Sequence, residues 1–258
     1  MYETYNRIRA YLFRLLDSKF GTKTERMRYF SSFISGYDFD SLLDIGCGMG
    51  LLFDNMSSSG DAKLLVGVDL MKTRKGRYQH VVASATALPL IDGAFSLVTA
   101  YSLVEHISEE EREPFYREAK RVTKNHGTFL IQLPNRYFII ESHTYMPFFG
   151  FLPSRLHSFA YRGEYVAVPS IKTVLGSLEE NGFEVYNIER YEGQFLPFSR
   201  FFRSIGLFYL FPMGYIIYAR VRKTKDDRNI RLMTFQHQSD KERSLSVNSS
   251  RAQRRRHN

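Results

Sequence analysis

A short apolar strand runs directly into a glycine-rich turn at residues 42–50, which read Leu-Leu-Asp-Ile-Gly-Cys-Gly-Met-Gly. The residues that follow, beginning with Leu51, are compatible with a helix. In such a strand–turn–helix unit, glycines permit positive φ angles and let a ligand approach the N–H groups at the helix N-terminus. A plain tight turn is the alternative interpretation, because one glycine triplet has low specificity.

Short apolar runs alternate with helical stretches along most of the chain. Two helices are expected before residue 38, one between Ile107 and Thr128 with Ser108 and Glu111 as a capping box, and one from a Ser170 cap to Gly182. This alternation predicts a doubly wound α/β domain with a parallel sheet covered on both faces. The last two strands have no comparable helix between them, which indicates an antiparallel pair at one edge. The expected strands are residues 41–45, 64–68, 80–83, 95–100, 128–133, 184–189 and 214–221.

The formal net charge of +9 belongs mainly to the end of the chain. Residues 220–258 contain 12 Lys or Arg and 4 Asp or Glu, which leaves 24 basic and 23 acidic residues in 1–219. We therefore expect one nearly neutral domain over residues 1–223 and a basic, disordered tail over 224–258. Nucleic-acid binding by the domain is not favoured, and only the basic tail has the charge to bind a nucleic acid.

Compartment and membrane contact are judged from cysteine content and apolar runs. The N-terminal segment has charges among its apolar positions, and the chain has a single cysteine, so a cytoplasmic location is expected. The aromatic stretch at 195–218 includes an uncharged run of 16 residues at 204–219, shorter than the roughly 20 needed to span a bilayer. A peripheral, interfacial segment and a core-packing connection are the two interpretations left open.

Two aspartates add chemistry to the glycine turn. Asp69 ends the second strand, where a carboxylate can accept both hydroxyls of a ribose, although a helix N-cap is the alternative. Asp44 lies inside the first strand, where a buried carboxylate is costly unless it is paired. A cationic ligand provides such pairing. S-adenosylmethionine carries both an ammonium and a sulfonium group, so it fits an acidic strand end that has no phosphate-binding lysine.

Five collinear segments between residues 40 and 135 resemble the motifs of class I S-adenosylmethionine-dependent methyltransferases. The resemblance implies a Rossmann-like, mostly parallel seven-stranded sheet with an antiparallel edge strand, a helical extension at 1–38 and a substrate-covering insertion at 134–168. It implies an enzyme of the methyltransferase class with S-adenosyl-L-methionine as cofactor. The five segments are 42–50, 66–69, 83–95, 102–107 and 121–127.

The resemblance also assigns the cofactor-binding residues. Asp44, Gly46 and Gly48, with Cys47 between them, would hold the methionine moiety. Asp69 would bind the ribose, and Leu70 and Met71 follow it, with Met71 beside the adenine. Ser84 stands where the family often has an aspartate that contacts the adenine amine, so a backbone group at Ala85 is expected to replace it. Tyr101, after the fourth strand, would close over the methionyl portion.

Two Glu–His clusters are the candidates for acid–base chemistry. Methyl transfer needs alignment above all, and a base is needed only where the acceptor must lose a proton. Glu105 and His106 follow the fourth strand, and Glu141 and His143 follow the fifth. Capping for Glu105 and a buried structural histidine for His106 are the alternatives. A similar Glu–His pair binds a divalent metal in ubiquinone-pathway O-methyltransferases, but Ser102 replaces the third ligand here, so no metal is predicted.

Aromatic residues crowd the insertion at 134–168, which favours a small hydrophobic, aromatic or lipid-like methyl acceptor, with peripheral membrane contact as an option. An RNA or protein methyltransferase that gathers substrate with its basic tail is the second hypothesis. A non-catalytic S-adenosylmethionine-binding protein is the third.

Overall fold

The computed structural model describes residues 22–56, 64–72, 76–138, 151, 167–191, 203–206 and 212–222, with only the backbone for 22–26. Its centre is a seven-stranded sheet in the order β3-β2-β1-β4-β5-β7-β6. Strand β7 runs antiparallel to both neighbours, and the other pairings are parallel. The strands are β1 (Ser41–Ile45), β2 (Leu64–Asp69), β3 (Gln79–Val82), β4 (Phe95–Tyr101), β5 (Thr123–Pro134), β6 (Phe183–Tyr191) and β7 (Gly214–Val221).

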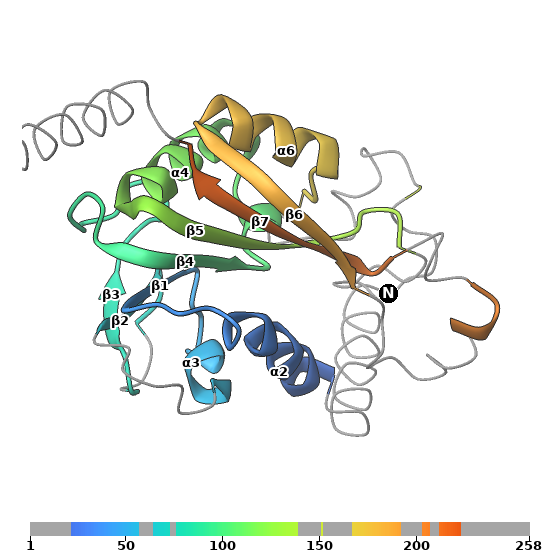
Figure 1. Ribbon diagram of the computed structural model, residues 1–258, viewed down its shortest axis with the longest axis horizontal. Helices are drawn as coiled ribbons and strands as arrows, with labels where there is room; N and C mark the ends of the chain where they lie inside the picture. Colours follow the sequence, from blue (N-terminus) through green and yellow to red (C-terminus); the bar gives the residue numbers. More distant parts are fainter. Residues whose placement is uncertain are drawn as a thin grey trace, which may run out of the picture. The chain divides into compact units, whose positions relative to one another are not determined.

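Helices cover both faces of the sheet (Figure 1). On one face lie α2 (Thr22–Ile34) and α3 (Leu51–Asn55), and on the other lie α4 (Glu109–Val122) and α6 (Ile171–Glu180). Phe30 and Leu52 pack with Leu42 of β1 in the first layer, while Phe115 and Leu178 pack with other buried residues in the second. Burial of these apolar stripes stabilises the arrangement, at roughly 25 cal/mol per Å² of apolar surface removed from water.

The predicted doubly wound, mostly parallel sheet is confirmed, including the antiparallel pair at its end. The antiparallel strand β7 is inserted between β5 and β6, so β6 forms the edge. Helix α6 has the predicted Ser170 N-cap, whose hydroxyl accepts the N–H of Thr173 at 3.1 Å. Gly182 has the expected positive φ, at 80°. The predicted helix before α2 and the tail at 224–258 lie outside the described residues.

Two local predictions around α4 differ from the structure. The Ser108 hydroxyl makes no cap bond to the backbone and instead lies 3.0 Å from the Glu111 carboxylate. The helix ends at Val122 and β5 begins at once, so residues 123–127, which precede the predicted strand at 128–133, also form part of the strand. A register shift between Phe95 and Leu97 and a positive φ at His126 accommodate this irregular strand start.

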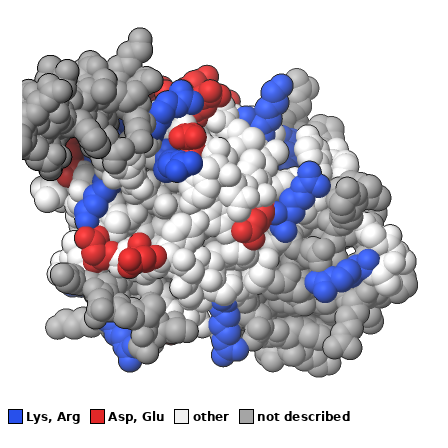
Figure 2. Space-filling view, in the orientation of Figure 1, with Lys and Arg blue, Asp and Glu red and all other residues white. Residues whose placement is uncertain are grey.

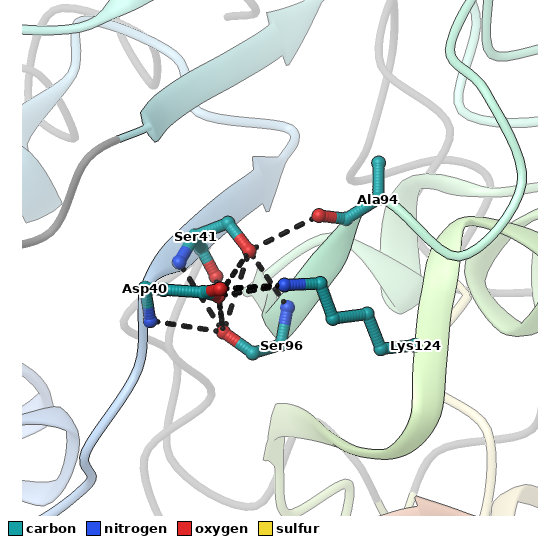
Figure 3. A network of polar contacts seen from close by, with 5 residues as sticks. All are labelled: Asp40, Ser41, Ala94, Ser96 and Lys124. Atoms are coloured by element: carbon teal, nitrogen blue, oxygen red, sulfur yellow. Dashed lines mark hydrogen bonds and ion pairs between the residues drawn. The ribbon is translucent and has the colours of Figure 1, made fainter.

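A polar network fastens the amino ends of three strands (Figure 3). The Asp40 carboxylate accepts a hydrogen bond from Ser96 Oγ at 2.7 Å and from Lys124 Nζ at 2.7 Å, and Ser41 Oγ lies 2.8 Å from it. These bonds to Lys124, Ser96 and Ser41 hold the pKa of Asp40 well below its usual range. The network therefore holds together the amino ends of β1, β4 and β5, at the opposite end of these strands from the glycine turn.

Charged side chains of both signs are interspersed over the described surface seen in Figure 2. This distribution agrees with the nearly neutral count for residues 1–219. No helix among the described residues is long and apolar enough to cross a membrane.

Candidate functional site

The glycine-rich turn after β1 has the backbone geometry that its sequence predicts. Gly46, Gly48 and Gly50 have φ angles of 75°, 51° and 76°, a region that side chains with a Cβ rarely enter. The N–H groups of Gly46 and Cys47 both donate to the Val68 carbonyl, at 2.8 and 3.0 Å, so the turn stays attached to β2. A Cβ placed on Gly48 would meet no atom within 4 Å, which leaves open space above the turn.

Asp69 joins the turn after β1 to the segment after β2. Its Oδ2 accepts the N–H of Gly48 at 2.9 Å, and its Oδ1 accepts the N–H of Met71 at 3.0 Å. Each carboxylate oxygen keeps a further lone pair, because an ionised carboxylate has about four acceptor sites. The half-buried carboxylate is therefore held in place and can still accept hydroxyl groups from a ligand.

Asp44 lies beneath this surface. Its side chain is 2% exposed, and Thr99 Oγ1 on β4 donates to it at 2.8 Å. Burial raises the pKa of Asp44 to about 7, with a further contribution from the negative charge of Asp69.

The residues expected around an adenine line the same edge of the sheet. Leu70 and Met71 follow Asp69 and are 73% and 74% exposed, so two large apolar side chains face solvent. The N–H of Ala83 donates to the Asp69 carbonyl at 3.1 Å, which brings the half-buried Ser84 and Ala85 next to this strand end. Exposed apolar side chains beside a fixed carboxylate suit a flat base attached to a ribose.

Tyr101 and Leu103 form the boundary between this edge and β4. Tyr101 is half-buried, and its ring contacts Phe30 edge-on with centroids 4.5 Å apart. A Cβ on Gly46 would lie 2.8 Å from Leu103 Cδ1, so the segment after β4 touches the glycine turn directly. The segment after β4 and the glycine turn are thus in direct contact.

Glu105 and His106, the first candidate pair for acid–base chemistry, differ in exposure. Both lie in the short helix η1 (Val104–His106), where Glu105 is 0% exposed and His106 is exposed. The Glu105 carbonyl accepts the N–H of Ala167 at 2.8 Å, and the Arg112 guanidinium donates to the Ala167 carbonyl. The backbone of Glu105 is therefore tied to the segment at Ala167, and its side chain is buried.

The second expected cluster, Glu141 and His143, lies outside the described residues, as does most of the insertion at 134–168. Within the described part of the chain, no three His, Cys, Asp or Glu side chains gather closely enough to hold a metal ion.

Tyr78 supports the glycine turn, and sequence reasoning did not identify it. Its ring stacks on Phe53 with centroids 4.2 Å apart. A Cβ on Gly50 would lie 2.4 Å from the Tyr78 hydroxyl oxygen, and one on Gly67 would lie 2.8 Å from the ring. The sequence feature that could have indicated this contact is Gly67, because a glycine inside an apolar strand often marks a close approach by another group.

A hydrogen-bonded chain of Ser102, Gln132 and Tyr191 was also not predicted from the sequence. Ser102 Oγ donates to Gln132 Oε1 at 2.6 Å, and Gln132 Nε2 donates to the Tyr191 hydroxyl. Gln132 and Tyr191 are 2% and 3% exposed, whereas Ser102 is half-buried. The signal was a glutamine in an otherwise apolar strand, since a buried amide requires partners.

Comparisons with known proteins point to the methyltransferases that the sequence motifs resemble. Residues 43–131 match the family model described as a methyltransferase domain. A probable S-adenosylmethionine-dependent methyltransferase of Mycobacterium tuberculosis is 28% identical over 102 residues, which are 37% of this chain and 36% of that protein. An ajmaline N-methyltransferase of Rauvolfia serpentina is 27% identical over 103 residues, 35% of each protein. The chain matches at most 46% of the length of its curated relatives.

The fold is shared with solved structures. An S-adenosylmethionine-dependent methyltransferase from Archaeoglobus fulgidus superimposes with a TM-score of 0.57 at 20% identity, over 81% of this chain and 99% of that one. Residues 43–131 thus match a methyltransferase domain, and the strand order and superposition show that the described sheet has the fold of S-adenosylmethionine-dependent methyltransferases.

Proposed function

We propose that this protein binds S-adenosylmethionine along the glycine turn and transfers its methyl group to a small hydrophobic, aromatic or lipid-like acceptor. The observation that carries the proposal is the Asp69 carboxylate, fixed by the N–H groups of Gly48 and Met71 beside an open, glycine-lined surface. The bound cofactor supplies a methyl group on a positively charged sulfur.

The residues of the chain have separate roles in this proposal. Asp69 accepts the ribose hydroxyls, and Leu70 and Met71 cover one side of the adenine. The buried charge of Asp44 favours the cationic methionine portion, because charges interact more strongly where water is excluded. Gly46, Cys47 and Gly48 provide the close backbone approach, with Ser84, Ala85 and Tyr101 at the borders. Transfer then depends mainly on alignment of the acceptor.

The acceptor class is supported by aromatic side chains after β5. Tyr137 and Phe151 are 46% and 51% exposed, and their rings lie 5.5 Å apart. The Arg136 guanidinium carbon lies 5.7 Å from the Tyr137 ring centroid. The similarity to an ajmaline N-methyltransferase adds support for a nitrogen atom as the methyl acceptor. His106, Glu141 and His143 are the proposed candidates for a base, while the burial of Glu105 supports a structural role.

Two measurements test the proposal. Titration calorimetry should detect S-adenosylmethionine, and no binding would contradict the assignment. Incubation with methyl-labelled cofactor and a fractionated cell extract should then label a small-molecule or lipid fraction.

A variant that lacks residues 224–258 is the matched control for the tail. It should transfer label as well as the full chain does. Label that enters RNA instead, falls steeply with added salt and disappears with the tail would favour an RNA methyltransferase. Cofactor binding without transfer to any fraction would favour a non-catalytic role.

A further inference from the structure

We propose that Asp44 holds a proton in the ligand-free protein and releases it when S-adenosylmethionine binds, so that the affinity for the methyl donor rises with pH through neutrality. This behaviour rests on the proposed function and gives the same cofactor site a control by pH. Three features of the described residues carry it: the burial of the Asp44 carboxyl group, the hydrogen bonds of the groups around it, and the two contacts of the Thr99 hydroxyl.

Asp44 points into the interior between the sheet and one of its helical layers. Side chains alternate along a strand, and Leu42 belongs to the layer of α2 and α3, whereas Leu43 belongs to the opposite layer. Asp44 therefore points to the side of Leu42, where α2 and α3 contribute the apolar Phe30 and Leu52. Its side chain is 2% exposed. An ionised carboxylate loses its hydration in such surroundings, so burial favours the protonated form.

The first N–H groups of the glycine turn are used by other acceptors than Asp44. The N–H groups of residues 46–48 donate to a carbonyl of β2 and to the Asp69 carboxylate. Within the described part of the chain, the hydrogen bond to the Asp44 carboxyl group comes from Thr99 Oγ1, at 2.8 Å. A carboxylate that stays ionised in a protein interior typically accepts about two or three such bonds. The ligand-free surroundings therefore stabilise the charge of Asp44 only weakly.

The titratable groups around Asp44 also favour its protonated form. Asp69, at the end of β2, is the charged side chain that acts on Asp44, and its charge is negative. The Cys47 thiol in the turn lies close enough to respond to both carboxylates, and burial keeps this thiol neutral. Burial and the charge of Asp69 together raise the pKa of Asp44 to about 7, although the bond from Thr99 lowers it.

The Thr99 hydroxyl is placed to serve both states of Asp44. Its oxygen lies 2.8 Å from Asp44 Oδ1 and 3.3 Å from the Leu43 carbonyl oxygen, and it carries one proton. When Asp44 is protonated, it donates to Thr99 Oγ1, and Thr99 donates to the Leu43 carbonyl. When Asp44 is ionised, Thr99 donates to Asp44 Oδ1 instead. A rotation of one hydroxyl group therefore accompanies the loss of the proton.

A cation on the glycine turn reverses this balance. Asp44 comes just before the turn, and a Cβ on Gly48 would meet no atom within 4 Å, so the turn has open space for a ligand. A nearby positive charge favours the ionised carboxylate, so the pKa of Asp44 falls and its proton passes to solvent. No covalent bond of the cofactor changes in this step. At low pH, binding must also remove the proton, which weakens the affinity, whereas at high pH Asp44 is already ionised.

Titration calorimetry in buffers of different ionisation enthalpy counts the protons that are released on binding. At pH 6 the native protein should release about 0.9 proton more per S-adenosylmethionine than Asp44→Asn does, and at pH 9 the two proteins should release the same number. Relative to Asp44→Asn, the affinity of the native protein should rise about tenfold between these pH values. The amino group of the cofactor also titrates, but it contributes equally in both proteins, so the difference reports on Asp44.

Variants of Thr99 test the role of its hydroxyl. Thr99→Val removes the donor that stabilises ionised Asp44, so proton release should persist to a pH about one unit higher. Thr99→Ser keeps the hydroxyl and is the matched control, with a pH profile close to that of the native protein. A native profile in Thr99→Val would contradict the role of the hydroxyl.

Infrared difference spectra of the native protein give the same answer without a variant, should Asp44→Asn not fold. The carbonyl band of a protonated carboxylic acid should disappear when S-adenosylmethionine binds at pH 6, and no such change should occur at pH 9. Equal proton release by the native protein and Asp44→Asn, or a band that persists on binding, would overturn the inference and leave the proposed function intact. Failure of the native protein to bind S-adenosylmethionine at any pH between 6 and 9 would contradict the proposed function itself.

Discussion

The carboxylate of Asp69 accepts the backbone N–H of Gly48 at 2.9 Å, across 21 residues of sequence. This bond fixes the distance between the turn after β1 and the segment after β2, so the two parts of the proposed cofactor site are positioned before any ligand binds. Preorganisation of this kind raises affinity because less freedom is lost on binding.

Asp69→Ala should weaken S-adenosylmethionine binding about a hundredfold, because it removes both the ribose acceptor and the bond that holds the turn. Asp69→Asn keeps one acceptor oxygen and should lose about tenfold. Titration calorimetry measures both affinities. Asp38→Ala is the control, since Asp38 is an exposed acid outside the site. Native affinity in Asp69→Ala would contradict the ribose contact.

Asp44→Asn should change how stability depends on pH. The unfolded carboxyl ionises near its usual pKa of 3.8, whereas burial raises the pKa of Asp44 in the native state to about 7. Between these values the native state binds more protons, so the free energy of unfolding of the native sequence falls as pH rises. Relative to Asp44→Asn, the fall should reach roughly 2–4 kcal/mol by pH 7 and then stop. Urea unfolding at several pH values measures it, and parallel curves for the two proteins would contradict the prediction.

Cys47 should be a poorly reactive thiol. Burial raises the pKa of Cys47 to about 12, and the negative charges of Asp44 and Asp69 add to the effect. At pH 8 the native protein should react with a thiol reagent at least about a hundredfold more slowly than it does in urea, because the thiolate is the reactive form. The chain has one cysteine, so the rate reports on this position alone. Asp69→Asn should speed the reaction, and equal rates with and without urea would contradict the prediction.

Arg121→Lys should destabilise the protein by about 1–3 kcal/mol, because lysine cannot reproduce the bidentate bonds of the guanidinium. Arg121 donates to both carboxylate oxygens of Glu118, at 2.7 and 2.8 Å, and to the Leu88 and Leu90 carbonyls, at 2.9 and 2.7 Å. Chemical denaturation measures the loss, and faster amide exchange should be confined to residues 88–93.

The matched control for this variant is Arg117→Lys on the same helix. The exposed Arg117 approaches Glu113 only to 3.9 Å, and surface ion pairs of this kind contribute little. An equal loss in the two variants would show that the contacts of Arg121 with residues 88–92 are not the cause.

Strand positions were predictable where apolar runs are bounded by strong turn signals. The bounds of β1 and β7 agree residue for residue with the sequence prediction. The start of β5 was not predictable, because residues 125–127 contain turn-forming side chains while pairing of Phe95 with Thr123 keeps this segment in the sheet. Tertiary pairing overrides local preference there.

The residues of the proposed cofactor site were easier to predict from the sequence than the Ser102–Gln132–Tyr191 chain. The glycines lie in one contiguous pattern and Asp69 ends the next apolar run, so their mutual contact follows from adjacent parallel strands. The partners of Gln132 come from residues 30 positions before it and 59 after it, so no local pattern reveals them. The orientation of η1 decides that Glu105 is buried and His106 is exposed. That orientation cannot be predicted from two adjacent residues.

The insertion of β7 between β5 and β6 has a consequence for biosynthesis. The ribosome makes β6 before β7, yet β6 has no other neighbour in the sheet. Until Gly214–Val221 has been synthesised, the side of β5 that pairs with β7 has no partner strand. Unpaired strand edges promote aggregation. A nascent chain that stalls before residue 214 would expose that edge, and among the described strands the last to be synthesised is the one that closes the sheet.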